Sequence, residues 1–199
     1  MPRPLQPLRQ IYVLFAVFAL AACETPSPAV TFPEITFQHK PPITLDVRQV
    51  SFEQVYRPPS RPPNVDHLFP VRPAAAAMRW GRDRLRAAGS TGRARYVVRE
   101  ASVVEVPLKV EGGLKGVLTV DQSERYDARL VVDVHLNSDE RRSLGTITVE
   151  VVRSQTAAED LSLNEREKVW FDMTEALMRD FDAELEKAIK SAFLEHLVM

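Results

Sequence analysis

The clearest hydrophobic pattern in the chain is the strict alternation between Glu124 and Leu136. Apolar side chains occupy every second position, and charged or polar side chains fill most of the positions between them. A period of two is typical of a strand with one buried and one solvated face. The predicted inner face consists of Tyr126, Ala128, Leu130, Val132, Val134 and Leu136.

Three further segments carry weaker versions of this pattern. Ile43–Val50 starts with alternation and predicts a half-buried strand. Ala94–Val106 predicts a second strand, whose alternation slips near Ala101 and so indicates a bulge. A turn at 137–140 leads into Arg141–Arg153, which predicts the last strand. The inner face of that strand is predicted to carry Ile147, Val149 and Val151.

The segment from Ala74 to Ala88 predicts a first helix. Pro73 suits the first helical turn, and Gly89 is a plausible C-terminal stop. Gly81 lies inside this helix at a cost of about 1 kcal/mol, which indicates a close packing contact. The predicted inner face consists of Ala77, Trp80, Leu85 and Ala88.

A long helix closes the chain. Ser162 and Glu165 have the spacing of a capping box, although Asn164 competes for the cap position. Apolar residues then recur every three to four positions, as expected for a helix with one buried stripe. We expect this stripe to be core rather than a cofactor or membrane face. It consists of Trp170, Met173, Leu177, Phe181, Leu185, Ile189 and Ala192.

The resulting order β-α-β-β-β-α predicts an α/β fold. Both helices must cover the apolar face of the strands, so we expect a two-layer sandwich: a four-stranded mixed sheet with two helices on one face. A right-handed crossover through the first helix makes the first two strands parallel if they are neighbours. The remaining strands form an antiparallel meander.

The N-terminal residues have the features of an export signal. Arg3 and Arg9 precede an apolar run that is too short to span a bilayer, and small residues follow up to Cys23, the chain's only cysteine. Leu20–Cys23 resembles the lipobox of bacterial lipoproteins, and this resemblance implies that Cys23 is lipidated and becomes the mature N-terminus. The alternative is an ordinary secreted protein with a stray cysteine.

These features predict a lipoprotein signal peptide over residues 1–22. A proline-rich tether is expected over residues 23–42, and a single α/β domain over residues 43–199. The protein is expected to be anchored in the cell envelope by lipid, facing the periplasm, on the outer membrane.

Composition and motifs exclude several kinds of function. The 26 basic residues balance 27 acidic ones, so global charge gives no indication of nucleic-acid binding. No nucleophile elbow, phosphate loop or dinucleotide motif is present. The four histidines lie on different predicted elements, at 39, 67, 135 and 196, without ligand spacing. We therefore expect no enzymatic activity, no cofactor and no metal site.

One charge asymmetry suggests a binding site. Residues 72–99 contain eight arginines and one acid, whereas residues 159–186 contain ten acids and three basic residues. Arginine forks match phosphate geometry, so Arg79, Arg82 and Arg86 are candidates for binding an anion or a lipid head group. The alternative is that the two helices lie side by side and their opposite charges complement each other.

The excursion between Pro107 and Ser123 is a second candidate. It carries five aliphatic residues in a loop-like hairpin, which form either an exposed apolar tip for lipid or a partner, or a flap folded over the end of the sheet. These residues are Leu108, Val110, Leu114, Val117 and Leu118.

The segment from Arg125 to Ile189, with the element order around it, resembles two families of small envelope lipoproteins. These are the LPS-assembly lipoproteins (LptE-like) and the auxiliary lipoproteins of MCE-type ABC transport systems (PqiC-like). The resemblance implies a non-catalytic accessory in envelope lipid or LPS transport. Its partners would be a transport permease complex or an outer-membrane barrel, with lipid or LPS as possible ligand. The alternative is a structural or assembly lipoprotein that binds only proteins, such as a cell-wall synthesis regulator or a secretion pilot.

Overall fold

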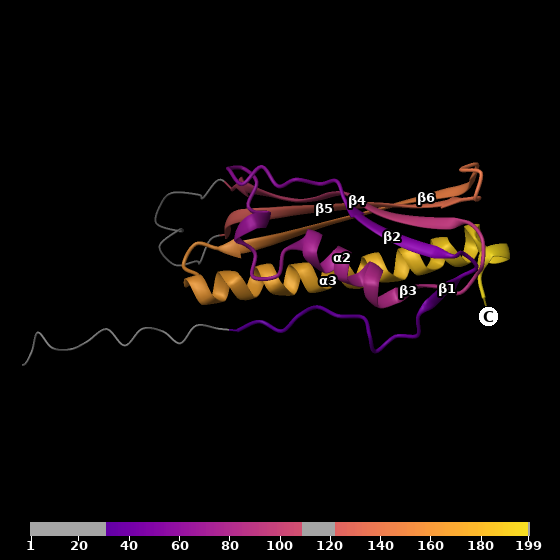
Figure 1. Cartoon of the computed structure of the whole chain (residues 1–199). Helices are drawn as coiled ribbons and strands as arrows, with labels where there is room; N and C mark the ends of the chain where they lie inside the picture. Colours follow the sequence, from indigo (N-terminus) through magenta and orange to yellow (C-terminus); the bar gives the residue numbers. More distant parts are fainter. Residues whose placement is uncertain (1–30, 109–121, 199) are drawn as a thin grey trace, which may run out of the picture. The chain divides into compact units, whose positions relative to one another are not determined.

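A computed structural model describes residues 31–108 and 122–198. Its main sheet has the strand order β2-β4-β5-β6. β2 (Gln49–Gln54) pairs in parallel with β4 (Arg93–Pro107), and β4, β5 (Gln122–Asn137) and β6 (Ser143–Ala158) form an antiparallel meander. The two helices lie on one face of this sheet (Figure 1). The predicted two-layer α/β sandwich with a mixed four-stranded sheet is confirmed.

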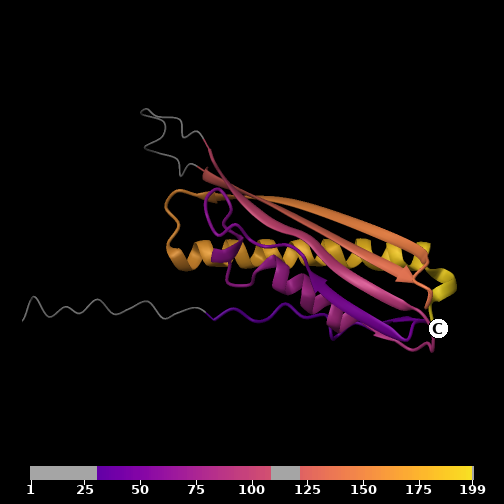
Figure 2. The ribbon, with the colours of Figure 1, turned by 45° about the horizontal axis from the view of Figure 1, so that its top comes forward.

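The inner face of the sheet follows the predicted alternation. All six inner residues predicted for β5 are buried, as are the three predicted for β6. The long strands lie side by side and twist together over the helices (Figure 2). The predicted bulge lies close to Ala101, because the register between β4 and β5 shifts between Val98 and Glu100.

The first predicted strand, Ile43–Val50, is wrong as a single element. The structure divides it into β1 (Ile43–Leu45) and β2, which belong to different sheets. β1 pairs in parallel with β3 (Leu85–Ala87), which the sequence did not reveal. The chain bends between the two strands, where the carbonyl of Val47 accepts a hydrogen bond from the Gly89 amide at 3.0 Å.

The first helix, α2 (Pro73–Arg84), ends four residues before the predicted Ala88. Leu85–Ala87 pair with β1 instead of continuing the helix, and Ala88 is exposed. Gly89 is needed for packing rather than for ending the helix. A Cβ there would lie 2.6 Å from the carbonyl carbon of Asp46 and 2.7 Å from the Val47 nitrogen. Gly81 makes the expected close contact, since its Cβ would lie 3.0 Å from the Phe52 ring.

The terminal helix, α3 (Leu163–Ala192), begins with the predicted capping box, and Ser162 is its cap. The predicted stripe is buried from Trp170 to Ile189, but Ala192 is exposed and Phe193 is buried in its place. Two short 3₁₀ helices complete the structure, η1 (Asp66–Leu68) and η2 (Leu194–His196). Among the described residues, no helix combines the length and the apolar character needed to cross a bilayer.

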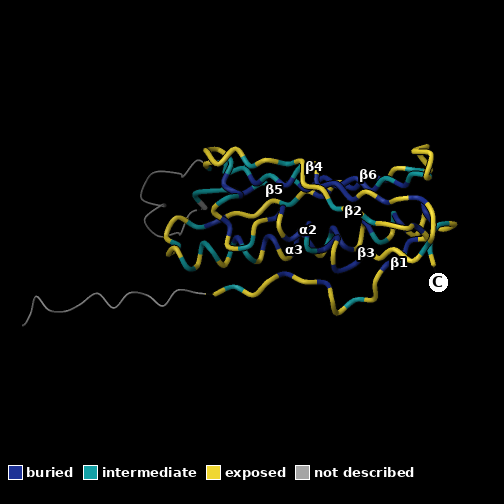
Figure 3. The backbone as a smooth tube through the Cα atoms, viewed as in Figure 1, coloured by how far each residue is buried: buried dark blue, intermediate teal, exposed yellow. Residues whose placement is uncertain are grey.

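The compact unit of the structure begins at Thr31, twelve residues before the predicted start of the domain. The segment Thr31–Pro42, expected to be part of the tether, contributes Ile35 and Phe37 to the core. Figure 3 shows buried stretches along this segment. We refer to Thr31–Pro42 as the strap.

Candidate functional site

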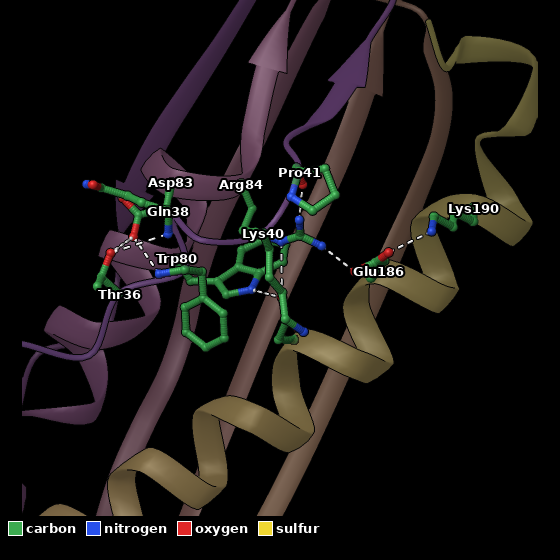
Figure 4. A network of polar contacts seen from close by, with 11 residues as sticks. Thr36, Gln38, Lys40, Pro41, Trp80, Asp83, Arg84, Glu186 and Lys190 are labelled. Atoms are coloured by element: carbon green, nitrogen blue, oxygen red, sulfur yellow. Dashed lines mark hydrogen bonds and ion pairs between the residues drawn. The ribbon is translucent and has the colours of Figure 1, made fainter. Parts of the chain in front are cut away.

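The strap is fastened to α2 by Asp83. The Asp83 carboxylate accepts hydrogen bonds from the Phe37 amide at 2.9 Å and from the Thr36 hydroxyl at 2.7 Å. The Gln38 side-chain amide donates a third, at 3.3 Å (Figure 4). A buried carboxylate is tolerated here because the strap supplies donors that replace water.

These contacts also set the protonation of Asp83. Burial acts to raise the pKa of the Asp83 carboxyl, because it disfavours the charged form. The hydrogen bonds from Phe37, Thr36 and Gln38 outweigh burial, and nearby Arg79 adds to their effect. The pKa of Asp83 therefore lies below its usual value, and the group that holds the strap is charged at neutral pH.

A second attachment joins the strap to both helices. Lys40 pairs with Asp182 of α3, and the Pro41 carbonyl accepts a hydrogen bond from the guanidinium of Arg84 on α2. Arg84 is 1% exposed and also contacts Asp182, at 3.1 Å, and Glu186. Figure 4 shows Arg84 at the centre of this network, between the strap and α3. A buried guanidinium needs such partners, because an uncompensated charge in the core is very costly.

The beginning of the strap is held by two further contacts. The ring of Phe32 stacks on Phe171 of α3, with centroids 5.1 Å apart. Glu34 pairs with Arg79 of α2 through both carboxylate oxygens, one of them at 2.6 Å. The beginning of the strap thus contacts α3 through the ring of Phe32 and α2 through the carboxylate of Glu34.

One cavity, of about 340 Å³, lies between the strap and α3. We call it the α3-side cavity. The aromatic rings of Phe37 and Phe171 provide apolar wall, and Lys40 and Arg179 provide cationic groups. Arg179 makes no ion pair among the described residues, whereas Lys40 is paired with Asp182. The remaining lining residues are Pro33, Glu34, Ile35, Thr36, His39 and Glu175.

A second cavity, of about 280 Å³, lies between the strap and α2. It is also lined by apolar groups and by arginines, namely Arg72 and Arg79. Pro33, Glu34 and Ile35 line both cavities, so this part of the strap is shared by the two. The strap and the two cavities together are the strap groove, our candidate functional site. A ligand with a hydrocarbon part and an anionic part matches this lining.

The three predicted anion-binding arginines have different surroundings in the structure. Arg79 lines the α2-side cavity, where its guanidinium is bound to Glu34. Arg82 is exposed, and Arg86 donates hydrogen bonds to the backbone carbonyls of Arg82 and Leu85. The alternative explanation, that the two helices pair through opposite charges, holds for a different residue, Arg84.

Other predicted site residues lie largely outside the described part of the chain. These are the lipidation site Cys23 and four residues of the proposed apolar tip, Val110, Leu114, Val117 and Leu118. Leu108, the fifth, is half-buried, and its amide donates to the Ser123 carbonyl at 2.8 Å.

A polar cluster lies beside this point, at the beginning of β5. Arg166 of α3 contacts Glu124 and donates to the Tyr126 hydroxyl at 3.1 Å. Burial and the neighbouring Glu124 carboxylate raise the pKa of Glu105.

Sequence reasoning missed the strap groove, although one signal was present. Ile35 and Phe37 alternate with polar residues in a segment read as a proline-rich spacer. The two buried side chains share one side of an extended segment, as the period of two requires.

No family model and no curated protein sequence matches the chain. Solved structures do show similarity. One is a minor lipoprotein from Acinetobacter baumannii, at 12% identity and a TM-score of 0.37, with 78% of this chain and 98% of that chain covered. Another is rare lipoprotein B from Shewanella oneidensis, at 14% identity and a TM-score of 0.38, with 75% and 100% covered.

A third similar structure is a Xanthomonas campestris protein of the DUF330 family, at 11% identity and a TM-score of 0.30, with 81% and 94% covered. The first two similar structures are lipoproteins by name. Because all three TM-scores lie below 0.5, the similarity carries no conclusion about the activity, ligand or partners of this chain.

Proposed function

We propose that this chain is a non-catalytic accessory lipoprotein of the bacterial envelope, anchored through Cys23, which binds an anionic lipid in the strap groove during lipid or LPS transport. The observation that carries the proposal is the lining of the α3-side cavity. Its lining includes two phenylalanines and the guanidinium of Arg179, which has no ion-pair partner among the described residues. Two carboxylates also line it: Glu34, which is paired with Arg79, and Glu175. Hydrocarbon packs on the rings, and a phosphate satisfies the guanidinium.

The chain length between anchor and groove supports this proposal. Thr31 follows Cys23 by eight positions. Eight fully extended residues reach at most about 29 Å. A lipid on Cys23 would therefore hold the beginning of the strap, and the two cavities beside it, close to the membrane surface.

The direct test is native mass spectrometry of the full chain in detergent with added phosphatidylglycerol, which is anionic, or phosphatidylcholine, which is zwitterionic. We expect one bound phosphatidylglycerol and at least several-fold weaker retention of phosphatidylcholine. Arg179→Gln should weaken phosphatidylglycerol binding about tenfold, the equivalent of one charge-assisted hydrogen bond. Phe171→Ala should weaken binding of both lipids, because it removes apolar wall.

The matched control is Arg142→Gln, which removes a similar charge at a site away from the groove. Arg142 is highly exposed, and within the described part of the chain Glu140 is its one ion-pair partner. If neither lipid binds, or if Arg142→Gln weakens binding as much as Arg179→Gln, the lipid site is wrong. A chain that binds no lipid but co-purifies with one envelope protein would instead support the alternative of an assembly lipoprotein with protein partners only.

A further inference from the structure

The two edges of the main sheet differ greatly. β2 forms one edge and is 6 residues long, and prolines follow it at positions 58 and 59. β6 forms the other edge and is 16 residues long. Its pairing with β5 continues without a register shift from Ala157 to Gly145, so nearly the whole edge is regular.

The outer side of β6 has no backbone partner within the described residues. No backbone–backbone hydrogen bond from a loop or another element reaches Ser143–Ala158. In an antiparallel ladder every second residue points its N–H and C=O away from the neighbouring strand. An edge of this length therefore presents a row of free donors and acceptors, which is a template for another strand.

β6 also lacks several of the features by which proteins usually protect an edge. It contains no proline, no lysine and no bulge within this regular stretch, and seven of its 16 residues are β-branched, which favours strand pairing. Its only charges are Glu150 and Arg153. Both are already paired within the chain, Glu150 with Arg129 at 2.8 Å and Arg153 with Asp180 at 2.6 Å. Near the middle, Val152 projects from the outer face with 64% of its surface exposed.

We propose that β6 pairs antiparallel with β6 of a second copy of this chain, which joins the two sheets into one of eight strands. The sequence of β6 is complementary to itself about Val152. With Val152 on the two-fold axis, the two exposed valines cover each other, Glu150 lies opposite Ser154, and Thr148 lies opposite Thr156. An axis at Glu150 would place two carboxylates opposite each other, which is unfavourable.

Self-complementarity favours a second copy over an unrelated strand as the occupant of this edge. Two-fold pairing uses the same residues twice, so a segment avoids self-repulsion only when its charges fall opposite neutral residues. In the register about Val152, Glu150 and Arg153 both do so, because Arg153 lies opposite Val151.

The test compares molecular mass in solution for the full chain in detergent, by sedimentation equilibrium. The wild-type protein should have twice the mass of one chain. Val152→Lys should give single chains, because it places two ammonium groups together at the axis. The matched control is Val55→Lys, the same substitution at a residue that is 53% exposed and follows the opposite edge strand. This control should remain dimeric.

A second variant tests the pairing register of the two β6 strands by cross-linking, without relying on dissociation of the dimer. Val152→Cys should form a disulfide-linked dimer under mild oxidation, since side chains directly opposite on an antiparallel pair approach to within disulfide reach. Val55→Cys and the wild-type chain, which has only Cys23, should not. A monomeric wild-type chain overturns the proposal. So does a dimer that Val152→Lys leaves intact while Val152→Cys fails to cross-link, since that dimer would use another surface.

Discussion

The indole N–H of Trp80 on α2 donates a hydrogen bond of 2.7 Å to the carboxylate of Asp182 on α3. Both side chains are almost completely buried, and Arg84 donates to the same carboxylate oxygen at 3.1 Å. The opposite charges of the two helices therefore meet in the core, beneath the strap, and not on the protein surface.

Asp182→Ala should reduce the free energy of unfolding by about 3–5 kcal/mol. The substitution removes the buried carboxylate that Arg84, Lys40 and the Trp80 indole share. Breaking a buried ion pair from one side has this cost. Urea titration followed by tryptophan fluorescence measures the change, since Trp80 reports on the site directly.

Asp180→Ala is the control for this prediction. Asp180 lies two residues earlier on α3 and pairs with Arg153, with both side chains more than a third exposed. Such a pair contributes less than about 1 kcal/mol. If Asp182→Ala and Asp180→Ala reduced the free energy of unfolding equally, the Arg84 network would not hold the two helices together.

Phe181→Ala should cost about 3–5 kcal/mol of stability. Phe181 is fully buried, and its ring packs edge-on against Trp80 with centroids 5.2 Å apart, so truncation leaves a cavity between α3 and α2. The same urea titration applies. A loss of less than about 1 kcal/mol, the range of ordinary surface changes, would contradict the assignment of this stripe to the core.

Asp83→Asn should loosen the strap while the rest of the domain stays folded. The substitution removes the charge that accepts the Phe37 amide, and a charge-assisted hydrogen bond is worth at least a tenfold change in opening equilibrium. Hydrogen exchange should therefore become at least tenfold faster at the Phe37 amide. Exchange in the β5–β6 ladder serves as the internal reference and should not change.

The same contact predicts a pH dependence. The pKa of Asp83 is lowered in the folded protein, so its contribution to holding the strap is complete above the ordinary aspartate value of about 3.9. It is lost as the pH falls further through the lowered pKa. Protection of the Phe37 amide, corrected for intrinsic exchange, should be constant between pH 7 and 5 and fall below about pH 4. In Asp83→Asn this fall should be absent, and a wild-type fall near pH 6 would point to a different group.

Gly89→Ala should destabilise the domain more than Gly145→Ala. At Gly89 the new methyl group meets backbone atoms of Asp46 and Val47 within 2.7 Å, so the bend between β1 and β2 must move. Such overpacking costs about 1–3 kcal/mol. At Gly145 the contact is with the ring of Phe193, which is a side chain and can shift. The melting temperature of Gly89→Ala should therefore be lower than that of Gly145→Ala. A lower melting temperature for Gly145→Ala would contradict the described bend.

Local pattern was sufficient to predict β4, β5, β6 and the terminal helix. The predicted inner residues of β5 are buried, as are those of α3 apart from Ala192, because each element has one face toward the same core. The capping box of Ser162 and Glu165 and the bulge near Ala101 are likewise local features, and both are present.

The strap groove could not be predicted in this way, because it depends on contacts between residues far apart in sequence. In the sequence, Asp83 is one acid among arginines. Only the fold brings it into contact with Phe37, which lies 46 positions away in the chain. The short β1–β3 pair could not be predicted for the same reason. Three residues are too few to show a period, and the pairing depends on the bend at Val47. Proline-rich composition predicted a tether over residues 23–42, but it contained no information on the docking of residues 31–42 against the helices.

The mass of the mature N-terminus tests the proposal that the domain works at a membrane as a lipoprotein. The full chain should be expressed in a bacterial host, extracted from membranes, and its N-terminal peptide analysed by mass spectrometry. We expect a mature chain that begins at Cys23 and carries a lipid thioether with more than one acyl chain, because a single acyl chain gives only marginal anchoring. Cys23→Ser should accumulate as the unprocessed precursor. A wild-type protein with a free thiol at Cys23 would contradict this proposal.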